Sequence, residues 1–393
     1  MLYCHRKELS DMKVLIAPDS FKECMDAFSV ADALAAGLRR SGVPARSIVR
    51  RPLADGGEGL LHVLHHALGG EIRFRRVSGP LGQKVKAAFG LLDNGRTAVI
   101  EMAQAAGLHR APPHKRDPRV TTTGGVGELM RHALDLGVER IIVGLGGSAT
   151  NDGGAGMAAA MGARFLDAAG HELPPGGAAL LQLAEIDMTG LDARIHDVEV
   201  VAACDVSNPL CGANGASHVY GPQKGATPEN VDELDAALRH YAAKIKARLG
   251  ADVAAVAGAG AAGGLAAGLV AFAGAKLRSG VELVFQAYGD MDTIIREADL
   301  IVSGEGAVDG QSAQGKVIAG LARKTKKVGK PLIVVAGKVG DDLDKLYAAG
   351  VAAVLPITAE PTTRRAALEK APLYLEQIGR AIGNLVPFLT SGL

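Results

Sequence analysis

Short apolar runs followed by amphipathic helical segments recur at both ends of the chain, and this alternation constrains the fold most. At the start, the runs Met12–Ala17 and Ser47–Arg51 are followed by helical segments over 29–40 and 58–68. Ser29 is the expected N-cap of the first helix. Apolar runs that alternate with helices predict parallel strands covered by helices, so the chain opens as a βαβα unit.

The same alternation returns near the C-terminus, after a middle third of a different kind. Three more strands are expected there, over Asp299–Ser303, Pro331–Ala336 and Ala352–Ile357. Two opening and three closing strands predict one five-stranded, doubly wound parallel sheet of the α/β class. This sheet domain takes residues 1–66 and 288–393, and residues 67–287 form an inserted mixed α+β domain.

The middle third contains a strong hairpin signal. Asp93-Asn94-Gly95 separates two apolar runs, Ala87–Leu92 and Thr97–Met102, and such a turn is typical of antiparallel strands. Further elements are expected at strand Arg140–Leu145, strand Asp197–Ala203, helix 127–136 and helix Pro228–Leu249.

Composition excludes several classes of protein. The 43 basic and 42 acidic residues leave a net charge of +1, which argues against a nucleic-acid or anionic-membrane partner. Four cysteines are too few for a disulfide framework and lack zinc spacing, and the polar N-terminal segment does not resemble a signal peptide. A cytoplasmic location is therefore expected. The uncharged stretch Val253–Ala275 is mostly Ala and Gly, which predicts a buried, closely packed loop and helix and not a membrane span.

Polar residues gather where the expected strands end. The clusters are Pro18–Lys22, Ala54–Gly59, Gly146–Gly154, Asp205–Pro209 and Gly304–Asp309. In open α/β sheets, ligands bind beyond the carboxyl ends of the parallel strands. Any one of these clusters is what an ordinary turn contains. Five of them at strand ends favour a binding site.

These residue types suit phosphoryl transfer, which needs donors around the phosphates, carboxylates for Mg²⁺ and a group that orients the attacking hydroxyl. Glycine lets backbone N–H groups approach a phosphate with no Cβ in the way. The candidate groups are the backbone amides of Gly146 and Gly147, the Ser148 hydroxyl, the oxygens of Asn151 and Asp152, and the ammonium groups of Lys22, Lys224 and Lys316.

Two familiar motifs are nearly matched. Gly310–Lys316 fits the GxxxxGK of a P-loop, but Val317 replaces the hydroxyl residue that would hold Mg²⁺. Gly258–Gly263 fits the dinucleotide pattern GxGxxG, but no convincing strand precedes it, so a tightly packed glycine-rich turn is expected.

Taken together, the chain resembles the glycerate kinase family of the two-domain bacterial type. The matching segments are APDSFK (17–22), PLADGGEG (52–59), TTTGGVGEL (121–129), GLGGSATNDGGAGM (144–157), CDVSNPLCG (204–212), GPQKGAT (221–227), GAGAAGGL (258–265) and SGEGAVDGQSAQGK (303–316). The chain departs from the family at Glu23-Cys24-Met25, where small residues are usual, and at Ala307, where a basic residue is frequent. Residues 1–11 precede the usual start, which makes Met12 an alternative initiator.

The resemblance implies a flavodoxin-like sheet domain interrupted by an insert of restriction-endonuclease-like topology. It also implies ATP- and Mg²⁺-dependent phosphorylation of D-glycerate, with 2-phosphoglycerate favoured over 3-phosphoglycerate, and it is compatible with a homo-oligomer. Because the polar clusters divide between the two domains, the reaction is expected in the cleft between them.

Residue roles follow from the same resemblance. The candidate catalytic residues are Asp55, Asp205, Asp309, Lys22 and Lys316, and Asp55 and Asp205 are also the candidate Mg²⁺ ligands. The candidate substrate- and phosphate-binding residues are Asp19, Ser20, Gly146, Gly147, Ser148, Asn151, Asp152, Asn208, Lys224 and Glu305. Two other functions stay open, an NAD-linked oxidoreductase of a small hydroxy acid and a non-catalytic metabolite-binding regulator.

Overall fold

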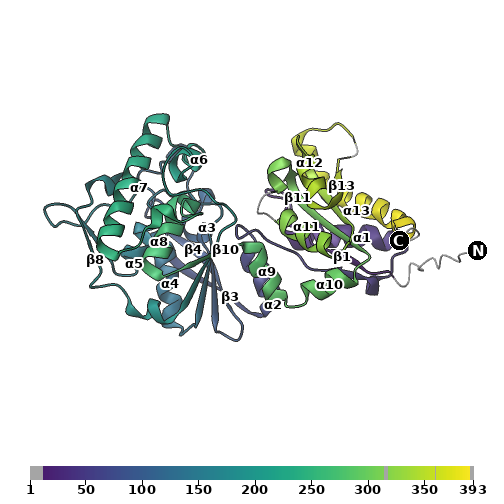
Figure 1. Ribbon diagram of the computed structural model, residues 1–393, viewed down its shortest axis with the longest axis horizontal. Helices are drawn as coiled ribbons and strands as arrows, with labels where there is room; N and C mark the ends of the chain where they lie inside the picture. The colour runs from purple at the N-terminus through teal and green to yellow at the C-terminus, as the bar shows by residue number, and fades with distance from the viewer. Residues whose placement is uncertain (1–11, 314–316, 359, 390–393) are drawn as a thin grey trace, which may run out of the picture. The chain divides into compact units, whose positions relative to one another are not determined.

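The structure, a computed structural model, describes residues 12–313, 317–358 and 360–389. The chain forms two compact units (Figure 1). The first contains the described residues up to Asp55 and those from Val284 onward, and the second is Gly56–Leu283. The borders expected from the sequence, at 66/67 and 287/288, lie later in the chain. Helix α2 (Leu60–Leu68), expected in the sheet domain, therefore falls in the second unit.

The first unit is built on a five-stranded parallel sheet with the strand order β13-β12-β11-β1-β2. Its strands are β1 (Val14–Ile16), β2 (Ile48–Arg50), β11 (Leu300–Val308), β12 (Leu332–Val339) and β13 (Val351–Pro356). They are the five strands that the apolar runs predict. Strand β11 runs further than expected, so Glu305 lies inside the sheet and pairs with Ala336 of β12.

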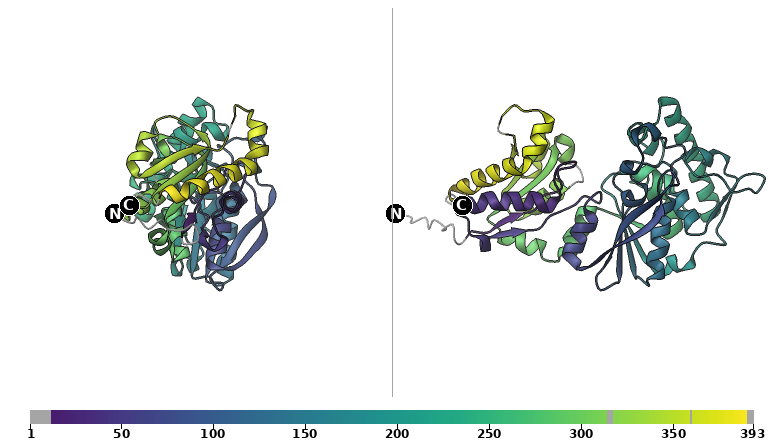
Figure 2. Two further views of the ribbon diagram at one scale, coloured as in Figure 1. Left: turned by 90° about the vertical axis from the view of Figure 1, so that its right-hand side faces the viewer. Right: turned by 180° about the vertical axis from the view of Figure 1, so that it is seen from behind.

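Helices cover both faces of this sheet, as a doubly wound fold requires. They are α1 (Ala27–Arg40), α10 (Met291–Glu297), α11 (Val317–Lys327), α12 (Asp344–Ala349) and α13 (Arg364–Leu389). Helices α1 and α13 lie side by side on one face (Figure 2). Helix α1 buries Val30, Leu34 and Leu38 against the sheet, and each such side chain contributes roughly 1.5–3 kcal/mol.

The expected N-cap of α1 is corrected by the structure. Asp26, not Ser29, caps the helix, and its carboxylate accepts a hydrogen bond from the Ser29 N–H at 2.7 Å. Asp and Ser are about equally good N-caps, so the residue type alone did not separate them.

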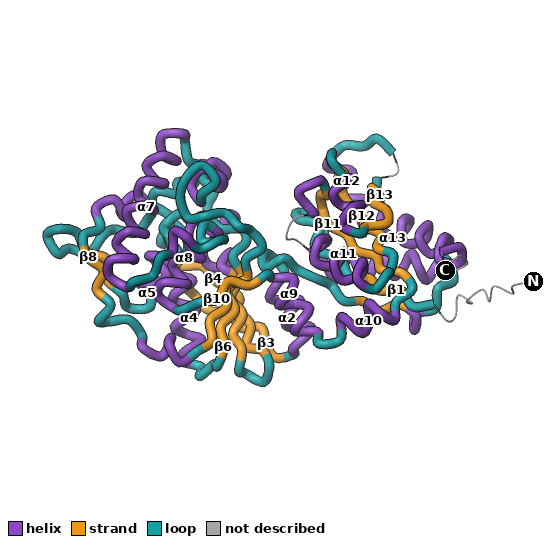
Figure 3. The backbone as a smooth tube through the Cα atoms, in the orientation of Figure 1, coloured by secondary structure: helices purple, strands orange, loops and turns teal. Residues whose placement is uncertain are grey.

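The second unit contains a mixed six-stranded sheet with the order β10-β9-β6-β5-β4-β3 (Figure 3). Its strands are β3 (Gly70–Ser78), β4 (Lys84–Leu92), β5 (Thr97–Glu101), β6 (Arg140–Gly144), β9 (Glu199–Ala203) and β10 (Lys276–Arg278). The predicted Asp93-Asn94-Gly95 hairpin is confirmed, because all three residues adopt positive φ between the antiparallel strands β4 and β5. Strands β5, β6, β9 and β10 run parallel.

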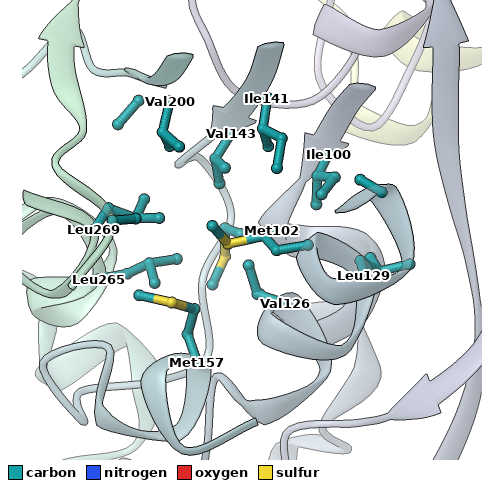
Figure 4. Close-up of a cluster of buried hydrophobic side chains, with 14 of the residues drawn as sticks. Ile100, Met102, Val126, Leu129, Ile141, Val143, Met157, Val200, Leu265 and Leu269 are labelled. Atoms are coloured by element: carbon teal, nitrogen blue, oxygen red, sulfur yellow. The ribbon is translucent and has the colours of Figure 1, made fainter. Parts of the chain in front are cut away.

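Helices pack on this sheet around an apolar core. The helices of the second unit besides α2 are α3 (Met102–Ala106), α4 (Gly124–Asp135), α5 (Ala155–Ala160), α6 (Ala216–Tyr220), α7 (Pro228–Leu249) and α8 (Leu265–Ala273). Strands β7 (Arg164–Leu166) and β8 (Glu185–Asp187) form a separate small sheet, and α9 (Gly280–Tyr288) crosses the border between the units. Figure 4 shows Val126 and Leu129 of α4 and Leu265 and Leu269 of α8 in the same core as Val143 of β6.

The apolar stretch Val253–Ala275 folds as short 3₁₀ turns followed by α8. Its glycine-rich part, Gly258–Gly264, is buried and follows a turn of 3₁₀ helix, not a strand. In the part of the chain that the structure describes, no helix combines the length and the hydropathy that crossing a bilayer requires.

Gly37→Ala is expected to lower the melting temperature, although alanine is intrinsically better in a helix by about 1 kcal/mol. A Cβ at Gly37 of α1 would lie 2.1 Å from the Glu376 carbonyl oxygen of α13, so the two helices must move apart, at a cost of about 1–3 kcal/mol. The matched control is Gly124→Ala in α4, where a Cβ meets ordinary contacts at 3.6 Å or more. Thermal unfolding should show the control unchanged or slightly stabilised; stabilisation by Gly37→Ala would contradict the close α1–α13 packing.

Candidate active site

Three carboxylates lie near the carboxyl ends of strands in the first unit, where two of them act on the third. Asp19 follows β1, Asp55 follows β2, and Glu305 lies on β11 between β1 and β12. Asp19 and Glu305 are buried, with 3% and 8% of their surfaces exposed. Burial raises the pKa of Asp19 well above its usual value, and the charges of Asp55 and Glu305 raise it further. This crowding of negative charge is what a bound cation would relieve.

The turn after β1 holds Asp19 in place. Its backbone N–H donates to the Gly304 carbonyl at 2.8 Å, and the Ser20 N–H donates to its carboxylate at 2.6 Å. The next residues form a tight loop closed by Phe21 and Met25, in which Glu23 has a φ of 64°. Residues with a Cβ seldom adopt this backbone conformation, so glycine would be less strained at this position than the glutamate found here.

A cavity of about 740 Å³ opens beside this cluster, and Ser20, Lys22 and Glu305 line it. The ammonium group of Lys22 also lowers the pKa of Asp19, against the effect of burial. Four predicted site residues of the first unit, Asp19, Ser20, Lys22 and Glu305, therefore come together.

Asp309 lies apart from them, on a second hollow of about 470 Å³ lined also by Lys338 and Asp341. Its side chain is exposed, and its backbone N–H meets the Ser312 hydroxyl at 3.3 Å. Lys316 and the end of the near P-loop motif lie outside the described residues.

In the second unit, three neighbouring parallel strands end in one row. Glu101 of β5 pairs with Gly144 of β6, and Gly144 pairs with Ala203 of β9. The loops that leave this row carry the predicted clusters Gly146–Gly154 and Asp205–Pro209. Parallel pairing thus gathers residues more than a hundred positions apart in the chain.

The loop Gly56–Gly59 packs against the ends of the same three strands, with glycine backbone in contact and no side chain between. A Cβ on Gly146 would lie 2.4 Å from the Gly57 Cα, and one on Gly56 would lie 3.0 Å from the Ala203 Cβ. Gly147 has a φ of 74°, which favours glycine, and its carbonyl accepts from the Leu108 N–H at 2.8 Å. Gly147 is exposed and Ser148 half-buried, so both remain accessible to a ligand.

The rest of this loop is buried and bonded to protein. Asp152 is 1% exposed and accepts hydrogen bonds from the Thr123 N–H at 2.8 Å, from the Thr123 hydroxyl and from two glycine N–H groups. Asn151 is also buried, and its side-chain amide donates to the Ser217 hydroxyl at 2.9 Å. Burial raises the pKa of Asp152, while the hydrogen bonds from Thr123 oppose the rise.

Lys224 is 1% exposed, and its ammonium group donates to the Thr150 carbonyl at 2.7 Å. Burial lowers the pKa of Lys224 to about 7, and the charge of Asp152 opposes this shift. The lysine therefore supports the loop from inside, which does not favour the predicted contact with a phosphate.

Two members of the 205–209 cluster are also bonded within the protein. Asp205 accepts from the Ser279 hydroxyl at 2.6 Å and from the Gly280 N–H at 3.0 Å, at the start of α9. Asn208 donates to the Asn214 carbonyl and accepts from the Tyr220 hydroxyl. Both residues lie at the predicted strand end, and both brace their surroundings.

Glu101 was not predicted. It is 4% exposed, and its carboxylate accepts from the Leu61 N–H at 3.0 Å, next to the start of α2. Burial raises the pKa of Glu101, and its hydrogen bond with Leu61 opposes the rise. Its position at the end of a predicted strand was the available signal.

Among the described residues, no three His, Cys, Asp or Glu side chains are placed to hold a metal ion together. Mg²⁺ needs fewer protein ligands, because it keeps several waters and binds through one or two carboxylates plus phosphate oxygens. One or two of the crowded carboxylates Asp19, Asp55 and Glu305 can meet that requirement.

Parallel sheets with glycine-rich turns and carboxylates at their strand ends define an α/β enzyme whose ligands bind at those ends. The chain belongs to the glycerate kinase family, whose profile matches residues 14–387.

Relatives of nearly full length support this assignment. The chain is 46% identical over 371 residues to a glycerate kinase of Bacillus subtilis (strain 168), covering 94% of this chain and 97% of that one. It is 47% identical over 382 residues to a glycerate 2-kinase of Escherichia coli (strain K12), covering 97% and 99%. A crystal structure from Salmonella typhimurium LT2, of a protein assigned as glycerate kinase 2, matches with a TM-score of 0.82 at 47% identity, covering 95% of this chain and 98% of that one.

Lys224→Met is expected to remove a pH dependence of stability. Unfolded lysine keeps its proton to about pH 10, whereas the buried Lys224 loses it near pH 7, so the unfolded state binds more protons between these values. Wild-type stability relative to the variant should then rise by about 1.4 kcal/mol per pH unit from pH 7 to about pH 10.

Urea unfolding at several pH values measures this difference. Lys244→Met is the matched control, because Lys244 also donates to a backbone carbonyl, that of Ala184, from a half-exposed position. The control difference should stay flat with pH, and an equally flat difference for Lys224 would contradict the assigned burial of its ammonium group.

Proposed function

We propose that this protein transfers the γ-phosphoryl group of ATP to D-glycerate. The observation that carries the proposal is the match to glycerate kinases along nearly the whole chain, at 46–47% identity. The retained strand-end clusters support it, since a protein that only binds a metabolite has no need of this set of carboxylates and lysines. A dinucleotide-binding motif follows a strand, whereas Gly258–Gly264 is buried and follows a 3₁₀ turn, so it gives no support to a dinucleotide site.

In the proposed reaction, the glycerate hydroxyl attacks the γ-phosphorus, the new O–P bond forms, and the bond to the β-phosphate oxygen breaks to release ADP. The hydroxyl proton passes to one of the strand-end carboxylates. Lys22 lies where it can offset the charge of the phosphates, because it lines the cavity beside Asp19 and Glu305.

The exposed Gly147 and the half-buried Ser148 are the proposed anion-binding elements of the second unit. Their backbone is held by Leu108 and by the glycine contacts beneath it, so the N–H groups need little reorganisation to bind a carboxylate or phosphate. Asp152 and Lys224 act in this proposal as buried supports of that loop.

One or two of the carboxylates Asp19, Asp55 and Glu305 are the proposed holders of Mg²⁺ in the first unit. Bound there, the ion would neutralise negative charge that develops on the phosphates during transfer. Asp205, the other predicted ligand, belongs to the second unit, where its oxygens meet Ser279 and Gly280.

Three finer points belong to the proposal. Numbered along the first unit, its strand order is 2-1-3-4-5, which supports a flavodoxin-like topology; restriction-endonuclease-like topology of the second unit is proposed on family resemblance alone. The likeness to the glycerate 2-kinase supports 2-phosphoglycerate as the product. A cytoplasmic location and a homo-oligomer remain predictions.

Glycerate-dependent release of ADP is the direct test. A coupled assay with D-glycerate, ATP and Mg²⁺ should show ADP production that depends on all three. The same reactions without ATP but with NAD⁺ serve as the control for the oxidoreductase alternative. Absence of glycerate-dependent ADP release, or an NADH signal instead, would overturn the proposal.

Asp55→Asn is expected to lower kcat by about 10²–10⁴-fold while the protein stays folded. The exchange removes a negative charge that disfavours ionised Asp19, so the melting temperature should stay equal or rise. Asp167→Asn is the control, because Asp167 lies in a turn where it accepts from the Ala169 and His171 N–H groups. The control should change turnover by less than about threefold, given its distance in sequence from every predicted cluster.

Asp205→Asn tests, in the same assay, whether Asp205 stabilises the start of α9 or takes part in catalysis. If Asp205 only braces α9, Ser279→Ala and Asp205→Asn should lower the melting temperature with similar, small effects on kcat. A large loss of kcat in Asp205→Asn alone, with an unchanged melting temperature, would restore the predicted catalytic role.

A further inference from the structure

The cavity of about 740 Å³ in the first unit has two chemically different walls. One wall comes from the turn after β1 and from β11, with Ser20, Lys22 and Glu305. The other comes from the segment after β13 and from α13, where apolar Ile357, Leu368 and Ala371 line the cavity together with Glu360 and Arg364. The two walls meet at one end, where the Cys24 thiol of the turn after β1 donates to the Leu368 carbonyl of α13 at 3.4 Å.

We propose that this cavity binds the nucleotide, with the adenine base against the β13–α13 wall and the phosphates toward the β1–β11 wall. The inference rests on the proposed ATP-dependent function and assigns its nucleotide site to the first unit.

Size and polarity favour a nucleotide over the acid substrate. Pockets for ligands of this size usually enclose about 300–1,000 Å³ and are mostly apolar with a few polar groups. A three-carbon acid would leave most of this space unfilled and gain nothing from Ile357 and Leu368. A purine base has two apolar faces that suit such a wall.

The charges of the wall fit a phosphate chain on the polar side. Arg364, on the apolar side, forms an ion pair with Glu23 at 2.5 Å. Lys22 lines the polar wall, and Lys338 of β12 lines both this cavity and the hollow that contains Asp309. Lys338 therefore adds a second lysine to the lining of this cavity.

Two glycines, Gly306 and Gly337, line the cavity with backbone atoms only. A Cβ on Gly337 of β12 would lie 2.7 Å from the Gly306 carbonyl oxygen, and one on Gly306 of β11 would lie 3.3 Å from the Phe21 Cα. The two strands and the turn after β1 thus approach as closely as their backbones allow, and the space above them stays free for a ligand.

Filling the apolar side tests the proposal. Ala367 of α13 lines the cavity, so Ala367→Phe should weaken ADP binding by at least about tenfold, measured by calorimetry without glycerate. Ala381→Phe is the matched control on the exposed face of the same helix and should bind ADP like the wild type. Unchanged ADP affinity in a folded Ala367→Phe variant would overturn the assignment, as would absence of ADP binding to the wild type.

A fluorescent reporter keeps the test independent of that variant's folding. The chain has no tryptophan, so Leu368→Trp creates a single reporter in the cavity wall. ADP should change its emission saturably, D-glycerate should not, and the exposed Ala381→Trp should respond to neither. If calorimetry shows that Leu368→Trp binds ADP but its tryptophan emission does not change, the assignment of this cavity as the nucleotide site is wrong. If ADP binds in this cavity but no glycerate-dependent ADP release is seen, the proposed reaction is wrong and the nucleotide site is still supported.

Discussion

Direct packing of backbone against backbone, at positions where only glycine fits, is the constraint on which the strand-end loops depend. A Cβ on Gly263 would lie 1.9 Å from the Thr150 carbonyl oxygen, and one on Gly177 would lie 2.4 Å from that of Asn151. With the contact of Gly146 on Gly57, these approaches press separate stretches of chain onto one loop. The high glycine content, 52 residues, thus has a structural use, because a methyl group at any of these positions would displace the loop that presents Gly147 and Ser148.

Buried polar groups complete what the glycine contacts begin. Lys224 and Asp152 are desolvated, which is unfavourable unless their hydrogen bonds are made. Lys224 donates to the Thr150 carbonyl, and Asp152 gathers donors from both Thr123 and the turn at 154–156. These bonds tie the loop after β6 to the start of α4 and to the turn before α7, so the loop has little freedom to open.

The sequence predicted those features that local chemistry decides. Alternating apolar runs gave the five parallel strands of the first unit, Asp93-Asn94-Gly95 gave the hairpin, and the pattern of Pro228–Leu249 matched α7 at both ends. Strand β3 was not predicted, because it is largely exposed and has arginines such as Arg73 and Arg75 in place of an apolar run. The burial of Lys224 was not predicted either. A lysine near Gly and Pro residues is typical of an exposed turn, and only the tertiary contacts bury this one.

The strand-end carboxylates divide into two kinds, which residue type alone could not separate. In the second unit, Glu101 ends β5 and Asp205 follows β9, the two strands beside β6, and each accepts a backbone N–H at the start of a helix. A helix N-terminus stabilises a negative charge and so offsets part of the cost of burying Glu101, whose pKa is raised by burial. In the first unit, burial opposes the ionisation of Asp19, and the charges of Asp55 and Glu305 oppose it further. A fold gains nothing from such repulsion, whereas a site that receives a cation and phosphates does. The contrast supports the proposal that the cation and the phosphates bind at the β1–β11 edge, beside the cavity that Lys22 lines.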